Sequence, residues 1–83
     1  ESIYIYYVLP KDMNIKEIEL TDSFKDGQFI VERFDYGSSS WKKIHSLVMR
    51  NIDDLNTNKL LALRLKGKGR VLIPDISLKG IMN

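Results

Sequence analysis

Alternation of apolar and polar residues indicates a chain built mostly of β-strands. Residues 2–9 read Ser-Ile-Tyr-Ile-Tyr-Tyr-Val-Leu, a run rich in the β-branched and aromatic types that favour strands. Period two places Tyr4, Tyr6 and Val8 on one face of this strand. Pro10 should end it, because proline cannot donate a hydrogen bond to a neighbouring strand. The opposite face carries the remaining apolar residues: Ile3, Ile5, Tyr7 and Leu9.

Two further strands are predicted in the N-terminal half. The alternation predicts a short strand over 16–21 and a longer one over 28–36. A two-residue hairpin at Asp26-Gly27 would pair apolar positions with charged ones. We therefore expect a longer loop over residues 21–27.

A helical period replaces the strand period after residue 40. Apolar residues recur three or four positions apart from Trp41 to Leu55, which is the spacing of one helical stripe. The serines at 38–40 offer hydroxyls that could cap a helix, so we expect a helix over 40–52. Its charges oppose the helix dipole, with lysines in the first turn and aspartates at the end: Lys42, Lys43, Asp53 and Asp54. This conflict indicates solvated charges, a functional site, or a contact between the two lysines and the acidic half of the chain.

The C-terminal third returns to alternation. After a turn at 56–58, residues 59–66 alternate, although their composition also suits a short helix. A β-branched run at 71–73, across Gly67-Lys68-Gly69, favours a hairpin. Three leucines share one side of the first of these strands: Leu61, Leu63 and Leu65.

Together these elements predict a small α+β domain. We expect a mostly antiparallel sheet of four or five strands, with one amphipathic helix packed on one face. Residues 1–83 are too few for more than one domain. Because the chain begins with Glu1 rather than Met, we expect a processed product or a piece of a longer protein. The expected core consists of apolar residues from every element: Ile3, Ile5, Leu20, Ile30, Trp41, Ile44, Val48, Ile52, Leu61, Leu63, Val71 and Ile73.

Charges and aromatic rings are divided between the two halves of the chain. Residues 1–40 carry eight acids and four bases, whereas residues 41–83 carry nine bases and three acids, for a net charge of +2. All eight rings lie at or before Trp41. The chain has no cysteine, which excludes a disulfide or a thiolate metal site, and its apolar runs are too short to span a membrane. We expect a cytoplasmic protein that does not bind a membrane.

Residue patterns typical of enzymes are missing from the sequence. His45 is the only histidine, and it lies beside the apolar stripe of the expected helix rather than on it. Glu17 and Glu19 share a strand face, but nothing nearby predicts the burial that would separate their pKa values. Residues 54–58 begin like a calcium loop, but its required glycine is absent. We therefore expect no catalytic residue, no metal, no cofactor and no enzymatic activity.

Interaction is the function that the sequence favours. The two-signed charge and the rings indicate a module that docks a protein partner or a second copy of itself. Its candidate interface is aromatic and basic: Tyr4, Tyr6, Trp41, Lys42 and Lys43. The alternative is binding of the nucleic-acid phosphate backbone by the basic half: Arg64, Lys66, Lys68, Arg70 and Lys79. Proteins that bind single-stranded nucleic acid usually interleave cations with aromatic rings. No ring follows Trp41 in this sequence, so protein docking ranks first.

One C-terminal segment contains an Asp-x-Ser-x-x-Gly pattern, formed by Asp75, Ser77 and Gly80. It resembles the strand-and-turn segment of PilZ domains, which combine this signature with an upstream Arg-x-x-x-Arg to bind a cyclic dinucleotide. The resemblance implies a fragment of a β-barrel with that ligand. The chain departs from the family pattern, because Arg64 and Arg70 are six residues apart.

Overall fold

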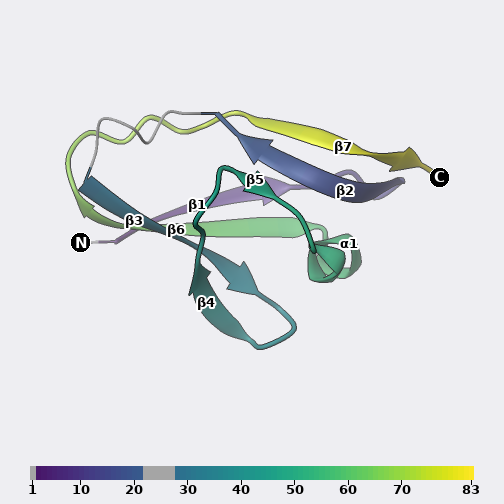
Figure 1. Cartoon of the computed structure of the whole chain (residues 1–83), viewed down its shortest axis with the longest axis horizontal. Helices are drawn as coiled ribbons and strands as arrows, with labels where there is room; N and C mark the ends of the chain where they lie inside the picture. The colour runs from purple at the N-terminus through teal and green to yellow at the C-terminus, as the bar shows by residue number, and fades with distance from the viewer. Residues whose placement is uncertain (1, 22–27) are drawn as a thin grey trace.

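The computed structural model describes residues 2–21 and 28–83, apart from the side chain of Gln28. This part of the chain forms two antiparallel β-sheets and one short helix (Figure 1). The elements, in chain order, are β1 (Ser2–Val8), β2 (Met13–Leu20), β3 (Gln28–Asp35), β4 (Ser40–Lys43), β5 (Val48–Met49), α1 (Asp53–Asn58), β6 (Leu60–Lys68) and β7 (Ile76–Met82).

Strand order differs from chain order in both sheets. Sheet A has four strands in the order β1-β6-β3-β4, and sheet B has three in the order β5-β2-β7. β6 therefore lies between two strands that come from the N-terminal half. This pairing brings the basic, ring-free half of the sequence against the acidic, aromatic half.

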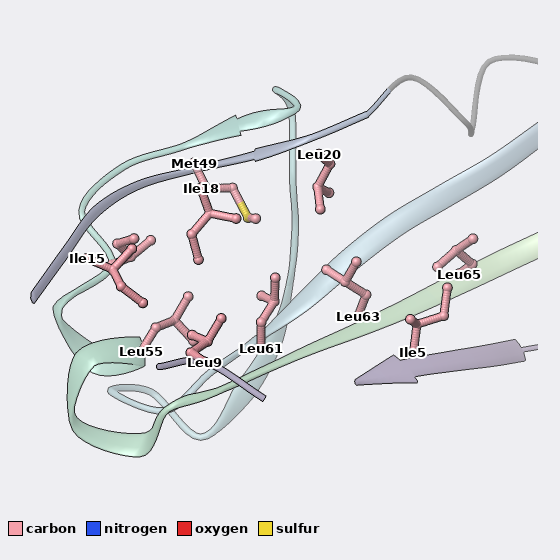
Figure 2. Packing of buried hydrophobic residues seen from close by; sticks show 11 residues of the cluster. Ile5, Leu9, Ile15, Ile18, Leu20, Met49, Leu55, Leu61, Leu63 and Leu65 are labelled. Carbon is pink, nitrogen blue, oxygen red and sulfur yellow. The ribbon is translucent and has the colours of Figure 1, made fainter. Parts of the chain in front are cut away.

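The core lies between the two sheets (Figure 2). Leu61, Leu63 and Leu65 point inward from β6 and are fully buried, as their alternation in the sequence predicts. Burying such a side chain contributes about 1.5–3 kcal/mol. The other core members come from both sheets, from α1 and from the loops beside them: Ile5, Leu9, Ile15, Ile18, Leu20, Met49, Ile52 and Leu55.

The predicted strands are confirmed where the alternation is long. The expected strands at 2–9, 28–36 and 59–66 correspond to β1, β3 and β6, and 59–66 is not a helix. β2 begins three residues earlier than the expected strand at 16–21. Most of the expected loop lies outside the described residues.

The expected helix at 40–52 is wrong, because this stretch contains β4 and β5. Residues 36–39 form a hairpin loop, and the backbone of Ser39 is left-handed, with a φ of 52°. The carboxylate of Asp35 stabilises the loop by accepting bonds from the backbone N–H of Ser38, at 3.1 Å, and from its hydroxyl, at 2.5 Å. The serines therefore shape a turn instead of capping a helix.

The helix that does form is short and lies farther along the chain. α1 spans Asp53–Asn58 and ends where Lys59 takes a left-handed conformation, with a φ of 54°. Asp53 and Asp54 occupy its first turn, where negative charge is favourable to the helix dipole. The apparent conflict with the dipole therefore came from placing the helix too early.

The expected hairpin across Gly67-Lys68-Gly69 is also wrong. Gly67 and Lys68 belong to β6 and pair with β3. The following segment crosses to sheet B, where β7 pairs with β2. Leu72 and Ile73 are exposed on this crossing, so the apolar run does not enter the core as a strand.

The coarse prediction of a small, sheet-rich α+β domain holds, but the helix is small and the strands form two sheets. Several expected core residues are not buried, because their segments adopt other elements or lie on outer faces. Ile3, Ile30 and Ile73 are exposed, and Trp41, Ile44, Val48 and Val71 are partly buried. In the described part of the chain, no helix has the length and apolar character needed to cross a membrane.

Candidate functional site

The most distinctive surface is the face of sheet A that points away from the core, which we call the aromatic face. Side chains alternate along each strand, so the inward leucines of β6 leave Arg64 and Lys66 pointing outward. The register then assigns residues of the neighbouring strands to the same face. Its members are Tyr4, Tyr6, Val8, Ile30, Glu32, Phe34, Tyr36, Trp41, Lys43, Arg64, Lys66 and Lys68.

Strand pairing interleaves rings and charges on the aromatic face. Tyr4 lies directly opposite Arg64, and Arg64 lies directly opposite Glu32. Lys43 on β4 is paired with Glu32, which completes a row across all four strands. The separation of rings from cations along the sequence therefore does not persist in the folded chain.

The rings pack on one another at steep angles. The centroid of the Trp41 ring lies 5.8 Å from that of Tyr4 and 5.4 Å from that of Phe34. Arg64 places its Cζ 4.7 Å from the centroid of the Trp41 ring, a cation–π contact. Tyr4 and Tyr6 remain 49% and 60% exposed. The sheet thus presents rings that are already ordered but still accessible.

Glu32 is held between two cations on this face. Arg64 Nε lies 2.9 Å and Lys66 Nζ lies 3.4 Å from its Oε1 atom. The hydrogen bond from Arg64 is the main cause that lowers the pKa of Glu32, and the same bond raises the pKa of Arg64. With Lys43 and Lys68, four cations share the described face with one carboxylate.

Sheet B carries a matching charge cluster without the rings. Glu17 lies 2.9 Å from Arg50 Nη2 and 3.4 Å from Lys79 Nζ. Burial acts to raise the pKa of Glu17, but these two cations outweigh it and the pKa is lowered. Among the described residues, none of the ring–ring or cation–ring contacts involves sheet B. The two clusters therefore differ mainly in their aromatic surroundings.

The two sets of candidate residues from the sequence largely merge on one surface. Tyr4, Tyr6, Trp41 and Lys43 join Arg64, Lys66 and Lys68 on the aromatic face. Two of the others face elsewhere: Lys42 lies on the opposite side of β4, 3.3 Å from Asp35, and Lys79 lies on sheet B. Arg70 is exposed on the crossing between the sheets.

Sequence reasoning did not include five members of this face among its candidate residues: Val8, Ile30, Glu32, Phe34 and Tyr36. The hydroxyl of Tyr36 donates to the carbonyl oxygen of Leu60 at 2.9 Å, and its ring lies 5.1 Å from that of Phe34. Burial is the largest cause that raises the pKa of Tyr36. Alternation within residues 28–36 could have grouped Glu32 with Phe34, but it could not have shown which strands lie beside them.

A small hollow lies beside the aromatic face, with a cavity volume of 220 Å³. His45 is exposed at this hollow, and the described lining contains no carboxylate. Pockets for small molecules usually measure about 300–1,000 Å³. Among the described residues, no group of three or more His, Cys, Asp or Glu side chains could hold a metal ion. This hollow therefore supplies no argument for a catalytic site.

Residues of the PilZ-like pattern lie just before β7 and within it. The backbone N–H of Asp75 donates to the Thr21 hydroxyl at 3.0 Å, and Ser77 is paired with β2. Gly80 lies so close to β2 that an added Cβ would be 2.3 Å from the carbonyl oxygen of Asn14. Arg64, by contrast, lies on the outer face of the other sheet. Comparison of the chain with family models, curated proteins and solved structures found no match in any of the three.

Proposed function

We propose that the chain is a non-enzymatic interaction module that binds a protein partner through the aromatic face. The supporting observation is that Tyr4, Tyr6 and Trp41 share one exposed surface with Arg64. Tyrosine, tryptophan and arginine are the residues most enriched at the energetic centres of protein interfaces. Rings already packed against one another lose little freedom on binding, which favours affinity.

The charges on this face define the chemistry of the partner. Four cations against one carboxylate favour a partner with an apolar patch rimmed by acidic side chains. Glu32 is already held by Arg64 and Lys66, so it needs no cation from the partner. Lys43 and Lys68, which are exposed, are the cations best placed to meet an acidic rim.

Site-specific photo-crosslinking in the producing cell tests the proposal. A photoreactive phenylalanine analogue at Tyr6 probes the aromatic face, and the same analogue at Lys79 probes sheet B as a control. We expect one discrete protein adduct from the first position and none from the second. Equal adducts from both positions, or none from either, would contradict the proposal.

The partner protein identified from the crosslinked adduct can then be purified, and its affinity for variants of this chain tests the individual residues. Tyr6→Ala should weaken binding by about 30-fold, which corresponds to about 2 kcal/mol for an interface anchor. Lys66→Glu should slow association, whereas Lys79→Glu should not. The last two substitutions make the same charge change at lysines that each lie 3.4 Å from a glutamate. If both substitutions slowed association equally, the aromatic face would not be the interface.

A second candidate function is the binding of single-stranded nucleic acid, and it is favoured by the interleaving of rings and cations. Tyr4 and Tyr6 would stack on bases, while Lys43, Lys66 and Lys68 would contact phosphates. Fluorescence anisotropy with a labelled single strand of about 16 nucleotides tests it at low salt. Binding that Lys66→Glu removes and Lys79→Glu preserves would favour this candidate over docking. Lack of binding to any single strand would eliminate it.

A further inference from the structure

The open edge of sheet A is a surface distinct from its aromatic face. We infer that two copies of this chain pair antiparallel through their β1 strands, which joins the two copies of sheet A into one continuous sheet. β1 hydrogen-bonds to β6 on one side only and forms an outer edge of the sheet (Figure 1).

The backbone groups that would form this contact follow from the β1–β6 register. The N–H of Leu9 donates to the carbonyl oxygen of Lys59 at 2.9 Å, at the end of the ladder. Hydrogen-bonded and non-hydrogen-bonded pairs alternate in an antiparallel ladder, so the odd-numbered residues of β1 point their backbone groups toward β6. The even-numbered residues therefore point theirs outward: Ser2, Tyr4, Tyr6 and Val8. Among the described residues, no recorded hydrogen bond uses these outward groups.

Exposed apolar side chains lie on β1 and on the crossing segment that precedes β7. Tyr7 connects β1 to the crossing segment before β7, because its hydroxyl donates to the carbonyl oxygen of Pro74. Six large exposed apolar residues lie on β1 and this crossing: Ile3, Tyr4, Tyr6, Val8, Leu72 and Ile73. Exposed apolar side chains on an edge strand are typical of an association site.

The chemistry of β1 suits a second copy of itself. Edge strands are usually protected by charged residues or proline, and Ser2–Val8 contains neither. Pairing β1 with itself therefore brings no like charges together. A two-fold axis at Ile5 would place Tyr4 opposite the partner's Tyr6 and Ser2 opposite the partner's Val8. This register uses all four outward-pointing residues, and it forms an aromatic cross-strand pair on each side of the axis.

This dimer and the proposed docking function can fail separately. Both involve the Tyr4 and Tyr6 rings, but only the dimer needs the outward backbone groups of β1, and only docking needs Trp41 and the cations of the aromatic face. In the dimer the two aromatic faces would lie side by side and present one wider surface.

Sedimentation between about 1 μM and 1 mM protein tests the dimer. We expect the wild type to be dimeric within this range. Val8→Pro removes an outward N–H and leaves the ladder to β6 complete, so it should yield a folded monomer. Val8→Ala keeps the N–H and should remain dimeric, while circular dichroism checks that both variants fold. A wild type that stays monomeric throughout would overturn the proposal, even if a strand from another protein binds the same edge.

Two double variants test the register with the same rings removed. Tyr4→Lys/Tyr6→Lys would place lysine opposite the partner's lysine and should be monomeric. Tyr4→Glu/Tyr6→Lys would place glutamate opposite lysine and should be dimeric. Identical association of the two variants would overturn pairing about Ile5. Because Val8→Pro keeps every ring of the aromatic face, its crosslinking from Tyr6 reports on docking separately.

Discussion

Replacement of Asp54 by asparagine should destabilise the chain far more than the same change at Asp53. The Asp54 carboxylate fastens α1 to sheet A, because its two oxygens accept bonds from Arg33 Nη1 at 2.9 Å and Nη2 at 3.0 Å. It also accepts the backbone N–H of Tyr36 at 3.0 Å. The Arg33 and Asp54 side chains are only 12% and 14% exposed. This is a paired, largely buried contact between elements distant in the sequence.

The expected magnitude follows from what asparagine keeps and loses. The amide would keep one oxygen acceptor but lose the negative charge and the second acceptor, and Arg33 would keep only its longer ion pair with Asp35, at 3.7 Å. Hydrogen bonds to charged groups contribute about 1.5–3 kcal/mol, and breaking a fully buried pair costs about 3–5 kcal/mol. Because both side chains still reach water, we expect a loss of roughly 2–3 kcal/mol. That is a large fraction of the stability of so small a domain.

Urea unfolding at pH 7 measures this loss, with the fluorescence of Trp41, the only tryptophan, as the signal. Asp53→Asn is the matched control, because Asp53 lies in the same first turn of α1 but is exposed. It should cost only about 0.3–1 kcal/mol, through the helix dipole. If the two variants lost equal stability, the Arg33–Asp54 pair would not hold α1 in place.

Low pH should remove the stabilisation that the Arg33–Asp54 pair provides. Burial acts to raise the pKa of Asp54, but the bonds from Arg33 and from the backbone of Tyr36 outweigh it, so the folded pKa lies below the usual value. The stabilisation is therefore complete above the unfolded pKa and is lost as the pH falls through the folded pKa. The stability difference between wild type and Asp54→Asn should shrink over that acidic range. A difference that stays constant with pH would contradict this account.

Two further substitutions test the core and the β2–β7 contact. Leu63→Ala should cost about 2–5 kcal/mol and leave the chain substantially unfolded at 37 °C, because Leu63 is fully buried. Leu72→Ala, at an exposed site, should melt like the wild type, and a wild-type melt of Leu63→Ala would refute the core assignment. Gly80→Ala should cost about 1–3 kcal/mol in urea unfolding, because its Cβ would lie 2.3 Å from the Asn14 carbonyl oxygen. Gly37→Ala, whose nearest neighbour would be 3.8 Å away, should cost much less, and equal losses would contradict the close approach.

The long strands were predictable because each has one face in the core and one in water. Residues 2–9, 28–36 and 59–66 all alternate for that reason, and β1, β3 and β6 form there. The alternation alone was sufficient to predict these strands, because it reflects which residues are buried. It does not show which strands pair with one another.

The helix was misplaced because two short strands imitated a helical period. Trp41, Ile44 and Val48 are spaced like one helical stripe, yet Trp41 lies on β4 and Val48 on the two-residue β5. Strands this short contain too few residues to show alternation. The charges were the warning, because lysines stood at the expected N-terminus and aspartates at the expected end, whereas α1 has Asp53 in its first turn, where negative charge is favourable.

The members of the candidate site were partly predictable, but their assembly was not. The exposed face of β1 predicted Tyr4 and Tyr6, and the basic run predicted Arg64 and Lys66. Their meeting depends on β6 inserting between β1 and β3, a pairing between residues far apart in the chain. The periodicity of a single segment does not show which distant strand will pair with it. Rings and cations are therefore separated along the sequence but interleaved in the sheet.

The division of charge along the sequence is partly neutralised inside the fold. Six of the seven ion pairs of the described residues join one residue from 1–40 to one from 41–83. Glu17 and Glu32 each take up two cations in this way. The ion pairs therefore neutralise part of the asymmetry locally, and the net positive charge of the aromatic face remains. The charge asymmetry of the sequence is thus a poor guide to the surface of the fold, where acids and bases from the two halves lie side by side.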